Sequence, residues 1–171
     1  MIILGIDPGL SSTGYGVVEK SRDKLRPLGY GNISTSSKAP LSARIDKIYR
    51  EVRELIDRYN PDLVVLEELF FNTNARSAMQ VGQARGGILL AAEHCGVAIE
   101  EYTPLQVKLT LVGHGQADKQ QVAYMVRTLL SIDEKIKTSH ASDALALAIC
   151  HAHHEKLMGR LDGGRRGSAA G

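Results

Sequence analysis

The sequence has little cysteine and no long apolar run. Its 171 residues include two cysteines, Cys95 and Cys150, which form no Cys-x-x-Cys pattern, so we interpret both as reduced, buried thiols. No stretch is apolar and long enough to cross a bilayer. The first residues lack the basic segment of a signal peptide, and Asp7 interrupts the first apolar run. We therefore expect a cytoplasmic protein that does not act at a membrane.

The sequence also lacks an excess of charge of one sign, since 21 Lys and Arg oppose 19 Asp and Glu for a net charge of +2. This balance does not by itself indicate a nucleic-acid-binding protein. It does not exclude one either, because acids can gather in a site while bases line the groove around it. We find no repeat and no dividing linker, so we expect one domain over residues 1–157. The small, polar residues 158–171 predict a disordered tail.

The order of strand and helix patterns predicts an α/β domain. Three strand patterns come first, and further strands then alternate with helices. Runs rich in branched apolar residues predict strands at 2–7, 14–20, 24–35, 62–68 and 97–102. Amphipathic or capped segments predict helices at 40–60, 74–95, 103–113, 118–130 and 139–157. We expect a five-stranded mixed sheet flanked by helices.

Two acidic residues end strongly apolar strands. Asp7 closes the run in ILGIDPG, where a buried and unpaired carboxylate would be costly, and Glu67 follows LVVL in the same way. Sites in open α/β sheets form beyond the carboxyl ends of strands, so these carboxylates converge if the strands are neighbours. Glu68 should point to the other face, and we therefore choose Glu67. For either acid alone, capping of a loop is an equally ordinary interpretation.

His140 and Asp143 lie three residues apart in SHASDALALAIC and share one face of the predicted last helix. Alone, an acid in the first turn after a serine is ordinary helix capping. With Asp7 and Glu67, however, these residues would form a cluster of three carboxylates and one imidazole, which requires cations. Carboxylates suit Mg²⁺ or Mn²⁺, and an imidazole shifts the preference toward Mn²⁺. Two such ions, about 4 Å apart, are the usual arrangement for phosphodiester hydrolysis.

Four segments in this order resemble the RuvC family of Holliday junction resolvases, the crossover junction endodeoxyribonucleases. They are GIDPGLSSTGYGVV, LEELFFNTNARSAMQVGQARG, TPLQVKLTLVGHGQADKQQVAYMV and SHASDALALAICH, and the resemblance covers roughly residues 1–155. It implies a ribonuclease-H-like fold, a homodimer and two divalent metal ions, Mg²⁺ or Mn²⁺, in each active site. It further implies symmetric nicking of two like-polarity strands of a four-way DNA junction in recombination and repair. The implied products are 5′-phosphate and 3′-hydroxyl ends, and the implied partners are RuvA and RuvB.

The resemblance also implies roles for individual residues. It places the metal-binding and catalytic positions on Asp7, Glu67, His140 and Asp143, where family members carry either Asp or His at the position of His140. Lys119 matches a basic family position that would stabilise charge on the scissile phosphate. Lys108 in QVKLT matches a second such position. Without the resemblance, both lysines would be interpreted as solvated surface charges.

Phosphate contacts should dominate the affinity for DNA and make it dependent on salt. The basic residues that we expect to make them are Arg76, Arg85, Lys108, Lys119, Lys135 and Lys137. Phe70 and Phe71 are the two phenylalanines of the chain and follow Glu67 closely, so one of them could stack on an unpaired base. The resemblance gives this role to Phe70 and inward packing to Phe71, although the reverse assignment and a core role for both stay open.

Three other functions fit parts of the sequence. Sugar-kinase, actin and Hsp70-like ATPases also carry a strand, an Asp, a Gly and a hydroxyl-rich turn, as in GIDPGLSSTG. They need a second, similar lobe and a Gly-rich adenosine loop, which we do not find here. A ribonuclease-H-like nuclease acting on RNA or an RNA–DNA hybrid would keep the fold and change the substrate. A junction-binding module without catalysis is opposed by the presence of all four expected ligands.

Overall fold

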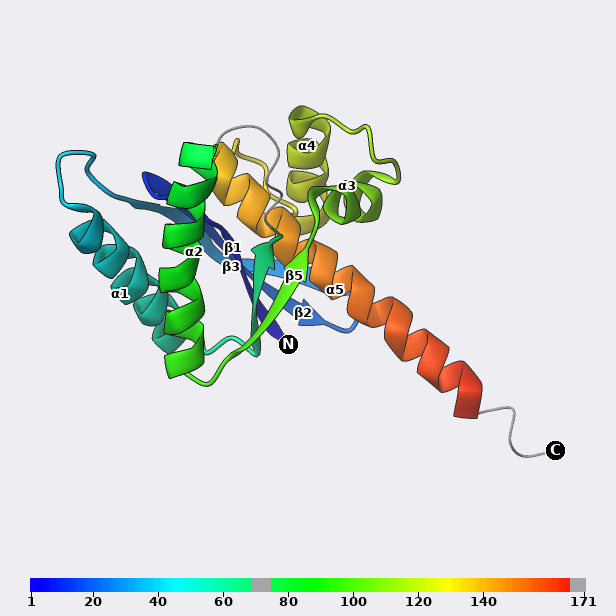
Figure 1. Ribbon diagram of the computed structural model, residues 1–171. Coiled ribbons are helices and arrows are strands. Elements are labelled where there is room, and N and C mark those ends of the chain that lie inside the picture. The colour runs from blue at the N-terminus through cyan, green and yellow to red at the C-terminus, as the bar shows by residue number, and fades with distance from the viewer. Residues whose placement is uncertain (69–74, 167–171) are drawn as a thin grey trace.

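The structure is a five-stranded sheet with helices on both faces (Figure 1). This computed structural model describes residues 1–68 and 75–166, with side chains for 1–68 and 78–155. The strands are β1 (Ile2–Asp7), β2 (Ser12–Ser21), β3 (Lys24–Ser34), β4 (Leu63–Glu67) and β5 (Ala98–Tyr102). The helices are α1 (Leu41–Tyr59), α2 (Ala75–His94), α3 (Pro104–Val112), α4 (Lys119–Leu130) and α5 (Ser139–Arg166).

The sheet is mixed, with the strand order β3-β2-β1-β4-β5. β1, β2 and β3 form an antiparallel meander, whereas β4 and β5 continue the sheet parallel to β1. Pro27 lies in the edge strand β3 next to a register shift, where a missing backbone N–H is tolerated. The α/β class and the five-stranded mixed sheet predicted from the sequence are confirmed.

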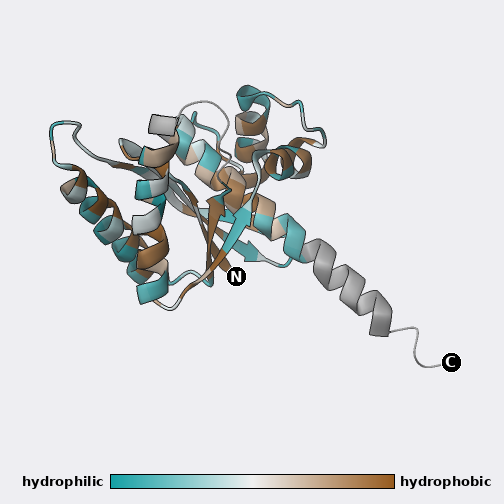
Figure 2. Ribbon diagram, viewed as in Figure 1, coloured by the Kyte–Doolittle hydropathy of each residue, from teal (hydrophilic) through white to brown (hydrophobic). Residues whose placement is uncertain are grey.

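The central strands are apolar on both faces because helices cover both sides of the sheet. Ile3 and Val65 pack in one core with α3, α4 and α5. Their neighbours in the sequence, Leu4 and Val64, point to the other face and pack in a second core with α1 and α2. Figure 2 shows the result, since β4 is brown over most of its length, whereas the edge strand β5 turns teal toward its carboxyl end.

Helix α5 lies directly on the sheet, on the face opposite α1 and α2 (Figure 1). Two strand glycines permit this close approach. A Cβ atom at Gly5 would overlap the carbonyl oxygen of Ala144, and one at Gly14 would overlap the carbonyl group of His140. The first turn of α5 is therefore held against β1 and β2, close to the end of β1.

The helix α5 runs to Arg166, beyond residue 157 where the predicted helix ends. Its side chains are described only as far as Glu155. The division into a domain over 1–157 and a disordered tail over 158–171 therefore stays a prediction. Within the described ranges, no helix is both long and apolar enough to cross a membrane.

Candidate active site

Asp7 and Glu67 lie side by side at the carboxyl ends of two adjacent parallel strands. Ile6 of β1 pairs with Leu66 of β4, so the next residue on each strand is the carboxylate. Side chains alternate between the faces of a strand, and Ile3 and Val65 point toward α5. Asp7 and Glu67 follow them by an even number of residues and share that face. This alternation directs Glu68 to the opposite face and supports the choice of Glu67.

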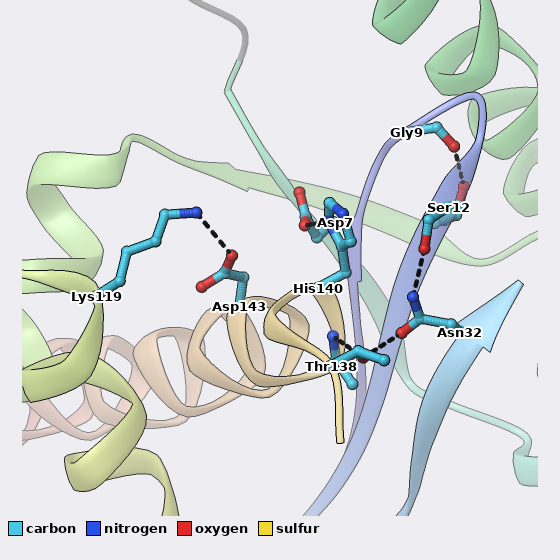
Figure 3. A network of polar contacts seen from close by, with 10 residues as sticks. Asp7, Gly9, Ser12, Asn32, Lys119, Thr138, His140 and Asp143 are labelled. Carbon is cyan, nitrogen blue, oxygen red and sulfur yellow. Dashed lines mark hydrogen bonds and ion pairs between the residues drawn. The ribbon is translucent and has the colours of Figure 1, made fainter. Parts of the chain in front are cut away.

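The first turn of α5 brings His140 and Asp143 to the same place (Figure 3). His140 Nδ1 donates a hydrogen bond of 2.6 Å to Asp7 Oδ2. On the other side, Lys119 Nζ of α4 lies 3.4 Å from Asp143 Oδ2. All five predicted site residues thus line one pocket of about 390 Å³, and Lys108 of α3 lines it as well.

The carboxyl groups in this pocket repel one another and are partly removed from water. Burial, followed by the charges of Asp7 and Asp143, raises the pKa of Glu67 to about 7. Burial also raises the pKa of Asp7, although the hydrogen bond and the charge of His140 oppose this effect. The cluster therefore holds more negative charge than its surroundings compensate.

The donor set fits a divalent cation by its chemistry. Three carboxylates and one imidazole are oxygen-rich ligands of the kind that Mg²⁺ and Mn²⁺ bind. A cation would also supply the missing positive charge and lower both raised pKa values. As the side chains stand, no group of three or more His, Cys, Asp or Glu in the described part of the chain is close enough to hold one ion. His140 and Lys119 instead engage Asp7 and Asp143.

A polar network holds the first turn of α5, and the sequence alone did not indicate it. Thr138 Oγ1 accepts a hydrogen bond from the backbone N–H of Ala141, which caps the helix, and donates one of 2.5 Å to Asn32 Oδ1 of β3. Asn32 Nδ2 in turn donates to Ser12 Oγ of β2 (Figure 3). The network ties the helix that carries His140 to strands β2 and β3.

Arg85 of α2 takes a different place from the one expected. Its side chain is 11% exposed, and it forms an ion pair with Glu101 of β5 and donates a hydrogen bond of 2.8 Å to the carbonyl oxygen of Glu67. The guanidinium group therefore joins the carboxyl ends of β4 and β5. The structure favours a role in positioning Glu67, and a direct contact of Arg85 with DNA stays a prediction that this position does not support.

The other predicted DNA contacts fall into three groups. Lys108 and Lys119 line the acidic pocket. Lys135 and Lys137 line a neighbouring pocket. Phe70, Phe71 and the side chain of Arg76 lie outside the described residues, and their roles stay predictions.

Two histidines of α5, His151 and His154, pack against Tyr102. Tyr102 Oη lies 3.0 Å from His151 Nδ1, and its ring contacts the rings of both His151 and His154. Burial is the main cause of the raised pKa of Tyr102, about 12, so the phenol in this hydrogen bond stays protonated. The pair packs on an aromatic ring of β5.

The strand order and the acidic cluster at the ends of β1 and β4 define a class of protein, the ribonuclease-H-like nucleases. Structural comparison agrees. The yeast mitochondrial Holliday junction resolvase Ydc2 matches with a TM-score of 0.63 over 88% of this chain and 78% of its own, and at 15% identity this likeness shows the fold alone. Thermus thermophilus RuvC, in a complex with a Holliday junction substrate, matches with a TM-score of 0.87 and 41% identity, covering 92% of this chain and 96% of that one.

The sequence comparisons identify the family within this class. The family model for crossover junction endodeoxyribonuclease RuvC matches residues 3–151. The crossover junction endodeoxyribonuclease RuvC of Desulforamulus reducens is 49% identical over 159 residues, which cover 93% of this chain and 98% of the relative. The chain belongs to the RuvC family of crossover junction endodeoxyribonucleases.

Proposed function

We propose that this protein resolves four-way DNA junctions by metal-dependent hydrolysis of phosphodiester bonds in homologous recombination and DNA repair. The observation that carries the proposal is the convergence of Asp7, Glu67, His140 and Asp143 on one pocket, in a chain of this family. The Thermus thermophilus relative was solved with a Holliday junction, which supports the same substrate here.

Asp7, Glu67, His140 and Asp143 would hold the metal, in the proposal two ions of Mg²⁺ or Mn²⁺. When bound, such ions activate a water molecule and neutralise charge on the leaving oxygen. The side chains then act as fixed ligands, since strand ends and a helix anchored on the sheet allow them little movement. The imidazole of His140 shifts the preference from Mg²⁺ toward Mn²⁺.

The two lysines of the pocket have a separate task. Lys119 and Lys108 come from α4 and α3 and face the acids across the pocket. Their ammonium groups would bind the scissile phosphate and hold it over the carboxylates, which alone would repel it. Lys119 is 82% exposed, so its side chain is free to turn from Asp143 to a phosphate. The products would carry 5′-phosphate and 3′-hydroxyl ends.

Symmetric cleavage of two like-polarity strands needs two sites, and we propose a homodimer. Met79 and Leu90 of α2 are 65% and 50% exposed. They are eleven residues apart, which is close to three helical turns, so they share one face of the helix. An exposed apolar stripe of this kind fits a contact with a second copy. Cooperation with RuvA and RuvB, a cytoplasmic location and a base contact by Phe70 or Phe71 complete the proposal.

The test compares three substrates at equal concentration: a four-way junction, a linear duplex and an RNA–DNA hybrid, each with Mg²⁺, Mn²⁺ or EDTA. We expect paired nicks in the junction with either metal, none with EDTA, and weak cleavage of the other two substrates. Preference for the hybrid would instead support a ribonuclease-H-like activity and contradict the proposal.

A further inference from the structure

A second pocket lies beside the acidic one, and Lys119 belongs to the walls of both. Its volume is about 660 Å³. It is formed by one side of α4, the connection from α4 to α5, and the start of α5. Its polar and charged lining comprises Lys119, Gln120, Tyr124, Arg127, Lys135, Lys137, Thr138, Ser139 and Ser142.

The charge in this pocket is positive. Lys119, Arg127, Lys135 and Lys137 are all part of its lining, and no acid is. Of the ion pairs formed by described residues, one involves Lys119 and none involves the other three. Three of the four cations are therefore available to an anionic ligand.

Ser142 also lines this pocket. The residue is 6% exposed, and its buried hydroxyl oxygen has no hydrogen-bond partner among the described residues. A buried hydroxyl without a partner is unfavourable, which makes a ligand acceptor the natural complement. The pocket also contains the N-terminus of α5, whose dipole favours negative charge. The basic residues and the serine thus point to one chemistry, an oxyanion.

We propose that this basic pocket binds a backbone phosphate of the DNA strand that enters the active site, a few nucleotides from the scissile bond. Lys135, Lys137 and Arg127 supply the charge, and the Ser142 hydroxyl donates to a phosphate oxygen. Since Lys119 borders both pockets, a strand whose scissile phosphate lies at Lys119 continues directly into the second one. This inference rests on the proposed function, because it takes junction DNA as the ligand.

The test measures junction binding without metal, so that no cleavage occurs, over a range of salt concentrations. The variant is Lys135→Gln with Lys137→Gln. The matched control is Arg22→Gln with Lys24→Gln. It removes the same charge from the turn between β2 and β3 and the first residue of β3, at the other end of the sheet from Asp7. We expect the pocket variant to bind roughly 10-fold more weakly, with a salt dependence lower by about two ion equivalents. The control should stay within about twofold of the wild type.

Equal affinity and equal salt dependence of the two double variants would overturn the inference. The wild type distinguishes this result from failure of the proposed function. If the wild type binds and nicks the junction while the two variants behave alike, only the pocket is wrongly assigned. If the wild type neither binds nor nicks it, the proposed function itself fails.

Ser142→Ala provides a second variant that separates binding from folding. We expect the junction affinity to fall about two- to fivefold, while the Tm of the free protein stays the same or rises because an unpaired buried hydroxyl is removed. A lower Tm with unchanged affinity would show that Ser142 serves only the fold, and would contradict its part in the pocket.

Discussion

Asp7 and Glu67 are placed where they oppose the stability of the domain. Each ends a strand that is otherwise apolar and largely buried, and burial raises the pKa of both carboxyl groups. A folded protein gains nothing from such an arrangement unless a ligand compensates the charge. A carboxylate in such a buried, apolar environment therefore indicates a functional site.

The substitution Glu67→Gln tests whether the charge of this carboxylate destabilises the metal-free protein. It keeps the shape of the side chain and removes one of the mutually repelling charges. In EDTA at pH 8, where Glu67 is ionised, we expect the free energy of unfolding to rise by about 1 kcal/mol and Tm by about 2–4 °C. Junction cleavage with Mn²⁺ should be lost, because a ligand is gone. Thermal unfolding and a nicking assay measure the two effects.

Glu54→Gln, on the exposed part of α1, is the matched control and should change neither quantity. A lower Tm for Glu67→Gln in EDTA would mean that the carboxylate is well compensated in the metal-free protein. The electrostatic account of the pocket would then be wrong.

The elements show why parts of the site could be predicted and others could not. Asp7 and Glu67 could be predicted from the sequence because side chains alternate between the two faces of a strand. The face on which an acid at the end of an apolar strand lies is therefore known. His140 and Asp143 could be predicted because residues three apart lie on the same face of a helix. The contacts of Asn32 and Arg85 were not, since they join segments that are distant in sequence. Gly5 and Gly14, inside strands, carried the one available signal of a helix lying close to the sheet.

The network at the start of α5 predicts an effect of Thr138 on metal binding. Thr138→Val removes the helix cap and the link to Asn32, whereas Thr138→Ser keeps a hydroxyl in the same place. We expect Thr138→Val to lose about 1 kcal/mol of stability and to need roughly 10-fold more Mn²⁺ for half-maximal cleavage. Thr138→Ser should restore the Mn²⁺ requirement. If both variants need the wild-type concentration, the network does not position His140.

Further along α5, His151 predicts a dependence of stability on pH. Burial lowers its pKa below the usual value, so the unfolded chain binds more protons than the folded one as pH falls through about 6.5. Stability from the neutral imidazole is therefore fully present above this pH and is lost below it. We expect His151→Gln to lose less unfolding free energy than the wild type between pH 7.5 and 5.5, by a small amount because solvent screens this half-buried side chain. An identical pH profile for the variant in chemical denaturation would contradict the assignment.

As a whole, the molecule is an α/β domain that presents an acidic pocket bordered by basic residues. The acids would bind metal, Lys108 and Lys119 would hold the scissile phosphate, and the basic pocket next to them would hold the strand that continues from it. A chain with a net charge near zero can bind DNA in this way because its acidic and basic residues lie in different places, although their numbers are nearly equal. The net charge of +2 carried no information about this arrangement.

The most direct measurement compares binding and nicking of a four-way junction by the wild type, Asp7→Asn and the surface control Asp57→Asn. Asp7→Asn removes one negative charge and keeps the shape of the side chain. The account predicts that it binds the junction at least as tightly as the wild type and does not cut it with either Mg²⁺ or Mn²⁺. Asp57→Asn should bind and cut normally. Cleavage by Asp7→Asn at the wild-type rate would contradict the assignment of the metal site.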